Sequence, residues 1–269
     1  MAEPRPFRVR LSTGVTLSGA EQGEAGAPAL ILLHGYSDSW PSFVPLMQHL
    51  PRSLRVVAVS VRGHGDSDQP AEGYGLASLA ADVAALLDAL GIARAVVLGH
   101  SMGSLVATRF ALDHPGRLDA LVLIGAFRTL KGNAGFEEMC RDSIAGMTDP
   151  VDADFVRSFQ ESTLAVRLPD DFFATVLAES GKLTAQVWRA VAASLRTEDH
   201  SAELGRIAVP TLILWGDRDN FTGEAEQRAL AAAIRGARLI PYANTGHALH
   251  WEQPERAASD IAAFLAGRR

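Results

Sequence analysis

Residues 95–103 read Ala-Val-Val-Leu-Gly-His-Ser-Met-Gly, a short apolar run that ends in the pattern Gly-x-Ser-x-Gly. The run predicts a buried strand, and the apolar positions that follow it predict a helix. A strand, a sharp turn and a helix in this order present the central serine, Ser101, on a tight turn, and the two glycines remove side chains that would clash there. The turn also places Ser101 at a helix N-terminus, where backbone amides favour developing negative charge.

A serine hydroxyl is a poor nucleophile without a base, so this stretch predicts a histidine and a carboxylate elsewhere in the chain. Without such partners, the same pattern would indicate only a tight turn that requires glycine, with a serine that takes no part in catalysis.

The composition is that of a globular chain. Of its 269 residues, 48% are hydrophobic and 21% are charged, with a net charge of −6 and an isoelectric point near 5.7. An acidic chain without a Lys/Arg cluster argues against a nucleic-acid partner. We expect a cytoplasmic protein with no membrane partner. The lone Cys140 cannot form an internal disulfide, residues 1–26 lack the apolar core of a signal peptide, and no apolar stretch approaches the length of a membrane span.

Apolar runs and amphipathic stretches alternate along most of the chain, which predicts an α/β fold with a parallel sheet covered on both faces. A hairpin or meander at the sheet edge is predicted first, and then buried strands. The predicted strands are 7–11, 15–18, 29–33, 54–60, 95–98, 118–124, 209–215 and 237–240. The predicted helices between them are 40–50, 79–90, 105–113, 224–234 and 253–265.

The alternation breaks between residues 127 and 202, where no buried strand is predicted. Four amphipathic stretches replace it, at 135–144, 152–162, 170–179 and 185–195. Because ligands bind at the carboxyl ends of the strands in such sheets, a helical block inserted there forms a lid. We therefore expect a core of residues 1–126 and 203–269 and a helical cap of residues 127–202. The alternative is that these helices belong to the cover of the sheet.

The favoured base is His247, which follows Gly246 in a loop between an apolar strand and the last helix. Such a loop can cross the end of the sheet toward Ser101, and His250 is its nearest rival. Among the other histidines, the position of His100 beside Ser101 predicts a side chain that points away from the serine. His34 and His64 stand in glycine-bracketed turns and are expected to be hydrogen-bonding turn residues.

The carboxylate must orient the histidine and stabilise the imidazolium that forms. Asp217 and Asp219 both follow the predicted strand at 209–215. Asp219 lies further into the loop and is favoured, because Asp217 directly follows a glycine and suits a turn role. Along the chain the three residues follow in the order Ser101, Asp219, His247. This is the order expected when the turn that carries the serine lies at the carboxyl end of a strand in a sheet of this kind.

An oxyanion formed at Ser101 needs two backbone amides that point to one spot. One is expected from Met102, the residue after the nucleophile, and the other from Tyr36, in the loop after the strand at 29–33.

Taken together, these motifs closely resemble the α/β-hydrolase superfamily, in its branch of small capped esterase-like enzymes. The matching segments are Leu32–Gly35, Arg62–Ser67, Gly99–Gly103, Pro210–Asp219 and Gly246–Glu255. The resemblance implies a mostly parallel eight-stranded sheet with helices on both faces and an inserted helical cap. In the family, the second aspartate of the Gly-Asp-x-Asp segment is the triad acid and the residue after His-Gly gives an oxyanion amide, which supports Asp219 and Tyr36.

Several details set this chain apart from parts of the family. Dehalogenases and epoxide hydrolases of the family carry an aspartate where Ser101 stands, and carbon–carbon bond hydrolases usually carry a glycine-rich segment where this chain has Tyr36-Ser37-Asp38. The family often has an aspartate at the position of Ser60 and a glycine at that of Ser104. We expect neither difference to touch the triad.

The sequence thus predicts a serine hydrolase that cleaves a carboxylic ester or lactone of a small to medium apolar substrate through an acyl-enzyme. It implies no organic cofactor and no metal, and it is compatible with a monomer or a homodimer. Trp188, Phe136 and Met147 are candidates for binding substrate from the cap. Two alternatives remain: a carbon–carbon or amide hydrolase with the same triad, and a non-catalytic small-molecule receptor on the same fold.

Overall fold

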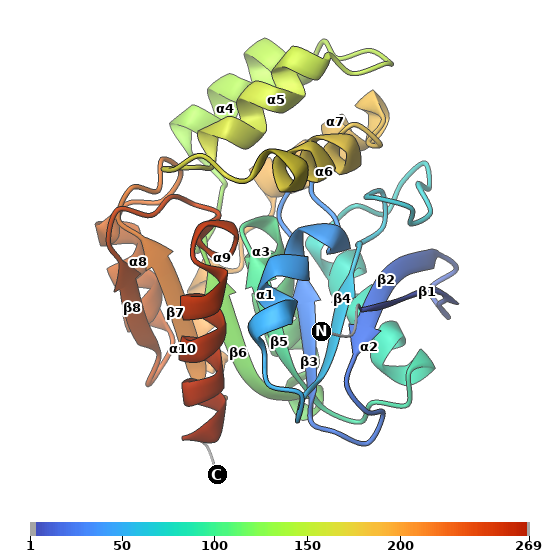
Figure 1. Cartoon of the computed structure of the whole chain (residues 1–269). Helices are drawn as coiled ribbons and strands as arrows, with labels where there is room; N and C mark the ends of the chain where they lie inside the picture. Colours follow the sequence, from blue (N-terminus) through green and yellow to red (C-terminus); the bar gives the residue numbers. More distant parts are fainter. Residues whose placement is uncertain (1–3, 268–269) are drawn as a thin grey trace.

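Eight strands form one mixed sheet in the computed structural model, which describes residues 4–267 (Figure 1). Across the sheet the order is β1-β2-β4-β3-β5-β6-β7-β8, and all pairs from β4 to β8 are parallel. The strands are β1 (Arg5–Arg10), β2 (Thr16–Gln22), β3 (Ala29–Leu33), β4 (Arg55–Val59), β5 (Ala95–His100), β6 (Leu118–Ile124), β7 (Thr211–Gly216) and β8 (Arg238–Tyr242). The mostly parallel eight-stranded sheet expected from the sequence is confirmed.

The central strands are buried along their whole length, which explains why they read as continuous apolar runs. Every residue of β3, β4, β5 and β7 is buried. The expected edge hairpin is present as the antiparallel pair β1–β2, with Arg5 opposite Glu21 and Arg10 opposite Thr16. β2 runs four residues further than the pattern indicated and pairs antiparallel with β4, so it joins the hairpin to the parallel part.

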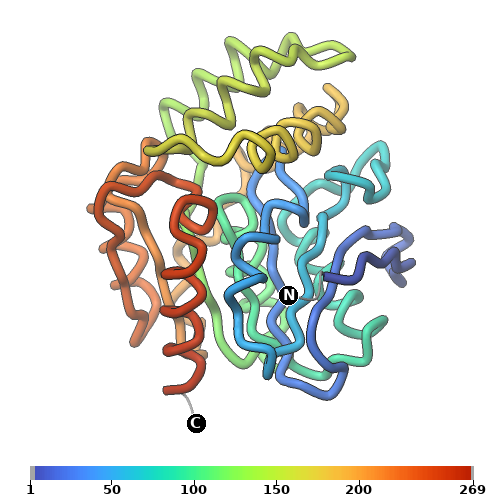
Figure 2. The backbone as a smooth tube through the Cα atoms, in the orientation of Figure 1, coloured from blue at the N-terminus to red at the C-terminus, as the bar shows by residue number. Residues whose placement is uncertain are grey.

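Helices cover both faces of the sheet, and alternate residues of each strand supply the two cores (Figure 2). On one face, Leu30 and Leu32 of β3 belong to a cluster with Phe43 and Leu46. On the other face, Ile31 belongs to a larger cluster. The first face carries α1 (Val44–His49), α9 (Leu249–Glu252) and α10 (Pro254–Ala266), and the second carries α2 (Leu76–Ala89), α3 (Met102–Asp113) and α8 (Glu224–Ala233).

The segment between β6 and β7 is helical and lies beyond the carboxyl ends of the strands (Figure 1). It contains α4 (Ala134–Met139), a π-helical turn (Cys140–Ile144), α5 (Ala153–Ser162), α6 (Asp170–Ser180) and α7 (Ala185–Thr197), and we call it the α4–α7 block. Four helices were expected here, and the first of them changes from α- to π-helical geometry at Cys140. The boundaries at 127 and 202 remain a prediction.

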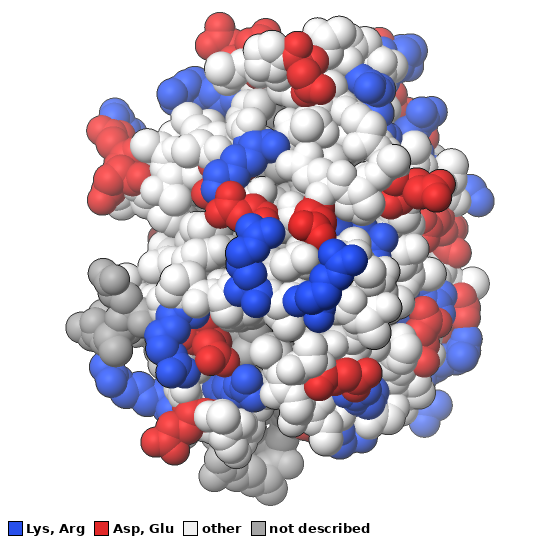
Figure 3. All heavy atoms as spheres, turned by 90° about the vertical axis from the view of Figure 1, so that its right-hand side faces the viewer, with Lys and Arg blue, Asp and Glu red and all other residues white. Residues whose placement is uncertain are grey.

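Charged side chains on the surface are mixed in sign rather than gathered. Figure 3 shows basic and acidic residues interspersed on one face of the molecule. Several of them form exposed ion pairs, such as Arg5 with Glu21 at 3.1 Å and Arg94 with Asp119 at 2.6 Å. Each helix within residues 4–267 is too short or too polar to cross a lipid bilayer.

Candidate active site

Ser101 occupies the turn between β5 and α3 at the centre of the sheet. Its backbone has φ 54° and ψ −119°, a conformation that L residues rarely adopt. Its amide donates to the carbonyl of Ile124, at the end of the neighbouring strand β6, at 3.0 Å. Strained backbone of this kind persists where the surrounding structure imposes it, commonly at functional sites. Here the two flanking elements impose it on Ser101.

The two glycines of the Gly-x-Ser-x-Gly pattern lie where no side chain fits. A Cβ atom on Gly99 would lie 2.1 Å from the carbonyl oxygen of Gly103. A Cβ atom on Gly103 would lie 2.2 Å from the carbonyl oxygen of Leu33 and 2.6 Å from that of His34. Glycine therefore allows α3 to pack directly against the ends of β3 and β5, and this contact holds Ser101 at the carboxyl end of β5.

Asp219 and His247 are hydrogen-bonded to each other, although 28 positions separate them. The loop after β7 carries Asp219 and the loop after β8 carries His247, and Nδ1 of the imidazole lies 2.8 Å from Oδ2 of the carboxylate. The side chain of His247 is 3% exposed and that of Asp219 is 0% exposed. Thus the structure pairs the two residues that the sequence favoured. Asp217 is exposed.

The carboxylate of Asp219 is held ionised by its hydrogen bonds. Burial raises its pKa, but the charge of His247 and the bonds from His247, Thr222 and Phe221 outweigh burial, so the net pKa lies below the usual value. Oδ1 accepts from the amides of Phe221 and Thr222 at 2.7 and 3.0 Å, and Oδ2 accepts from the Thr222 hydroxyl at 2.6 Å. An ionised Asp219 accepts the proton on Nδ1 of His247, which leaves Nε2 free to act as a base.

The other histidines near the site are buried, and burial lowers their pKa values. His34 lies with Nδ1 2.7 Å from the carbonyl oxygen of Gly35, and its Nε2 accepts from the Val61 amide at 3.0 Å. His64 lies with Nδ1 3.1 Å from the carbonyl oxygen of Arg62. Both are therefore hydrogen-bonding turn residues, as expected. His250, the rival of His247, is fully buried, and neither of its ring nitrogens has a hydrogen-bond partner among the described residues.

His100 lies closer to the other site residues than its place in the sequence suggested. It lines the same cavity as Ser101. Its ring centroid is 5.0 Å from that of His247, and its Nε2 is 3.3 Å from the carbonyl oxygen of His247. No local pattern indicated this contact, because it joins β5 to a loop 147 positions away.

The two predicted oxyanion amides flank the serine turn. Met102 is the first residue of α3, so its amide has no acceptor within the helix. Tyr36 lines the cavity, and among residues 4–267 its amide has no hydrogen-bond acceptor. The residue after it, Ser37, is fully buried with φ 64°. The Tyr36 ring also packs against the α4–α7 block, where its hydroxyl donates to the carbonyl of Trp188 at 2.5 Å.

Ser60 and Ser104, which stand where the family often has an aspartate and a glycine, have different surroundings. Ser104 donates from its hydroxyl to the carbonyl oxygen of Ser101 at 2.5 Å. The expectation that this position leaves the site residues untouched is therefore wrong, because a serine in place of glycine can reach back one helical turn. Ser60 accepts from the Trp40 amide at 3.1 Å, away from Ser101.

Ser101 and His247 line one small cavity under the α4–α7 block, with a volume of about 30 Å³. Helix α5 supplies part of its wall, and the loop after His34 supplies another part. The lining residues are Gly35, Tyr36, Asp38, His100, Ser101, Phe159, Gln160, Thr163, Phe221, His247 and Trp251. Within residues 4–267, no group of three or more histidine, cysteine, aspartate or glutamate side chains is arranged to hold a metal ion.

The three substrate-binding candidates from the cap are not among these lining residues. Trp188 is fully buried and packs edge-on against Tyr36, with ring centroids 4.7 Å apart. Phe136 and Met147 belong to the packing of the same core. Phe159, Gln160 and Thr163 reach the cavity instead, and the sequence reasoning missed them.

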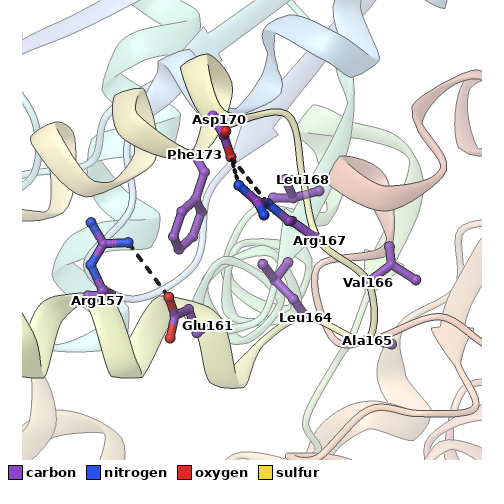
Figure 4. Close-up of a pocket in the computed structure, with 9 residues that line it drawn as sticks. All are labelled: Arg157, Glu161, Leu164, Ala165, Val166, Arg167, Leu168, Asp170 and Phe173. Carbon is purple, nitrogen blue, oxygen red and sulfur yellow. Dashed lines mark hydrogen bonds and ion pairs between the residues drawn. The ribbon is translucent and has the colours of Figure 1, made fainter.

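A second pocket lies between α5 and α6 (Figure 4). Phe173 and the α5–α6 connection line it, together with ion pairs of Arg157 with Glu161 at 3.6 Å and Arg167 with Asp170 at 2.6 Å. Neither Ser101 nor His247 lines this pocket, so it is separate from the cavity at the serine.

Comparison with known proteins places the chain in a family. A sequence model of the alpha/beta hydrolase fold matches residues 28–254. The AB hydrolase superfamily protein YisY of Bacillus subtilis (strain 168) is 33% identical over 267 residues, covering 95% of this chain and 97% of that protein.

Solved structures show the same architecture. A hydrolase from Pseudomonas aeruginosa PA01 superposes with a TM-score of 0.82 at 28% identity, over 97% of this chain and 98% of that one. An esterase from Exiguobacterium antarcticum superposes with a TM-score of 0.86 at 22% identity, over 97% and 99% of the two chains, a likeness of fold alone. The protein described here is thus a member of the α/β-hydrolase fold family.

Proposed function

We propose that the protein is a serine hydrolase that cleaves a carboxylic ester or lactone of a small to medium apolar substrate through an acyl-enzyme. One observation supports this most directly: Ser101, on its strained turn, lines the same cavity as His247, whose imidazole is 2.8 Å from the carboxylate of Asp219. The family to which the chain belongs, and its hydrolase relatives, add to that support.

In the first step, Nε2 of His247 takes the proton of the Ser101 hydroxyl while Oγ attacks the carbonyl carbon of the substrate. Asp219 holds the imidazole in the required tautomer through Nδ1 and stabilises its positive charge. The amides of Tyr36 and Met102 donate to the oxygen that becomes negative. The bond to the alcohol then breaks, and the imidazolium gives its proton to the departing oxygen.

In the second step, water replaces the alcohol. His247 takes a proton from the water, the hydroxide attacks the acyl carbon, and the bond to Ser101 Oγ breaks as the proton returns to the serine. The aromatic rings of Phe159, Phe221 and Trp251 line the cavity, which favours an apolar acyl or alcohol group.

An activity profile tests the proposal. Esters of graded acyl length, lactones and amides are assayed with the wild type, with Ser101→Ala and with the exposed-serine control Ser259→Ala on α10. We expect ester or lactone turnover that falls by roughly 10³–10⁶ in Ser101→Ala and is unchanged in Ser259→Ala. A serine-directed phosphonate should attach to Ser101 in proportion to the activity lost.

A folded Ser101→Ala variant that keeps more than about a tenth of the wild-type rate would contradict the serine mechanism. Binding of esters without multiple turnover by the wild type would indicate the receptor alternative. Cleavage of amides or of carbon–carbon bonds faster than that of esters would mean that the same residues act on a different substrate class.

A further inference from the structure

Asp38 lines the same cavity as Ser101, and the chemistry proposed for Ser101 does not use its carboxyl group. The residue lies in the loop after β3, two positions beyond the oxyanion residue Tyr36, and it is 2% exposed. Ser37, between them, is in the left-handed conformation with φ 64°. This loop therefore carries both a predicted oxyanion amide and a buried acid at one end of the cavity.

The carboxyl group of Asp38 is only partly satisfied by the protein. Oδ1 accepts from the Ser39 amide at 2.7 Å, and Oδ2 accepts from the Ser42 hydroxyl at 2.6 Å. A carboxylate offers about four acceptor positions, so capacity remains on both oxygens. Within residues 4–267, no lysine, arginine or histidine forms an ion pair with it.

One acid near Asp38, Glu179, has a cation partner of its own. Glu179 of α6 accepts from the Ser39 hydroxyl at 2.7 Å and pairs with Lys182 at 2.6 Å. Burial raises the pKa of Asp38 to about 7, and Glu179 adds to the rise, while the bonds from Ser42 and Ser39 oppose it. A buried acid without a cation is costly when ionised, and a donor brought by a ligand would lower this cost.

The donor groups of the polar side chains on the α5 wall are engaged within the protein. Gln160 donates from Nε2 to the hydroxyls of Ser37 and Ser180 at 3.1 and 2.8 Å, and Thr163 donates to the carbonyl of Gln160 at 2.7 Å. Asp38 is therefore the acidic acceptor that the cavity presents to a substrate.

We propose that Asp38 binds a hydrogen-bond donor, either a hydroxyl or an ammonium group, on the substrate close to its scissile carbonyl. The assignment rests on the proposed hydrolase function and narrows its substrate class to hydroxy-acyl or amino-acyl esters. Asp38 is thus a specificity-determining residue rather than a member of the catalytic machinery.

A matched ester series tests this assignment. Methyl propanoate, methyl lactate and methyl alaninate differ only in a hydrogen, a hydroxyl or an ammonium group on the second carbon, and a parallel series carries the same groups on the third carbon. Each ester is assayed as separate enantiomers where it is chiral, at a pH where the amine is protonated. We expect kcat/KM for at least one donor ester to exceed that of methyl propanoate by about tenfold or more, as one well-made bond to a charged acceptor gives.

Two substitutions assign the preference to Asp38. Hydroxyl and ammonium groups also activate the ester carbonyl by withdrawing electrons, so the reference is the ratio of the rates of alkaline hydrolysis of the free esters. Asp38→Leu should remove the part of the preference that exceeds this ratio, for both donor groups. Asp38→Asn keeps an acceptor but loses the charge, so a preference for ammonium should fall by about tenfold and a preference for hydroxyl should fall less. The control Ser259→Ala alters an exposed residue of α10 that does not line the cavity. It should leave the ratios of the rates of the esters unchanged.

Equal rates for propanoate and both donor esters in both series would overturn the proposal, as would a preference that is as large in both Asp38 variants as in the wild type. If no ester is hydrolysed, the proposed function fails separately and the amides propanamide, lactamide and alaninamide serve as the ligands. Thermal stabilisation by a donor amide that is lost in Asp38→Leu supports the assignment, because a bound ligand raises Tm. If all three amides raise Tm equally, or if none of them raises it, the assignment of Asp38 is overturned.

Discussion

Among single residues, Asp219 has the environment most clearly shaped for its proposed role. Its two oxygens accept four hydrogen bonds, from Phe221, Thr222 and His247, so the carboxylate is both ionised and fixed in place. Asp219→Asn should lower kcat by about 10⁴, because a neutral amide cannot hold the imidazole in the tautomer that leaves Nε2 unprotonated. The measurement is kcat on the best ester found in the activity profile.

Asp217→Asn provides the matched control, because Asp217 lies two positions away and is exposed. Its kcat should stay within a few-fold of the wild type. An inactive Asp217→Asn beside an active Asp219→Asn would reverse the proposed roles of the two aspartates.

The sequence could identify a site residue only where the pattern that marks it lies in the residues next to it. Ser101, Asp219 and His247 each stand in a short pattern of glycines and apolar positions at the end of a strand, so their loops could be assigned without a structure. The place of Asp38 in the cavity and the contact of His100 with His247 gave no such signal. The first depends on a left-handed Ser37, and the second joins β5 to a distant loop.

Among the elements, the contact between α3 and β3 fixes the position of the serine. Gly103→Ala would place a methyl group 2.2 Å from the carbonyl oxygen of Leu33, and backbone atoms cannot move aside cheaply. We expect a loss of roughly 3 kcal/mol or more in the free energy of unfolding, or failure to fold, measured by urea denaturation.

The control for this substitution is Gly116→Ala, just after α3, where an added Cβ would meet nothing within 4 Å. It should change the free energy of unfolding by no more than about 0.5 kcal/mol. A Gly103→Ala protein as stable as Gly116→Ala would show that the helix can separate from the strand without cost.

The α4–α7 block shows what an amphipathic pattern can predict and what it cannot. Periodicity placed its helices close to where they lie, because each buries one apolar side. It could not tell an apolar residue that faces the cavity, such as Phe159, from one that faces another helix, such as Trp188, because both belong to the buried side. The π-helical turn at Cys140 likewise has no periodic signature.

Across the whole molecule, four buried imidazoles surround the carboxyl ends of the central strands. Burial lowers the pKa of His250 to about 3 and that of His64 to about 4, and it holds the pKa values of His34 and His100 well below the usual range. Repulsion from neighbouring histidines adds to the effect at His34, His100 and His250. All four are therefore neutral in the folded state at pH values where an unfolded chain would protonate them.

This difference predicts a protein that loses stability as the pH falls from about 6.5 toward 4. In that window the unfolded state binds protons at the four histidines and the folded state does not, so each contributes a loss on the order of 1 kcal/mol per pH unit. Asp38 and Glu252 act in the opposite direction, because their raised pKa values let the folded state bind protons first. Burial also lowers the pKa of His200, so five histidines act against two acids. Acid therefore destabilises the fold, and stability above pH 7 should not depend on these histidines.

His250→Phe isolates one of the four contributions. The His250 ring packs 5.1 Å from that of Phe43, and neither of its nitrogens has a hydrogen-bond partner in the described part of the chain, so phenylalanine can replace it at similar volume. The slope of unfolding free energy against pH, from urea denaturation at several pH values between 4 and 7.5, should fall by on the order of 1 kcal/mol per pH unit. His49→Gln, at an exposed position, should leave the slope unchanged. An unaltered slope in His250→Phe would mean that the ring is already protonated in the folded state or that the site opens to water before the chain unfolds.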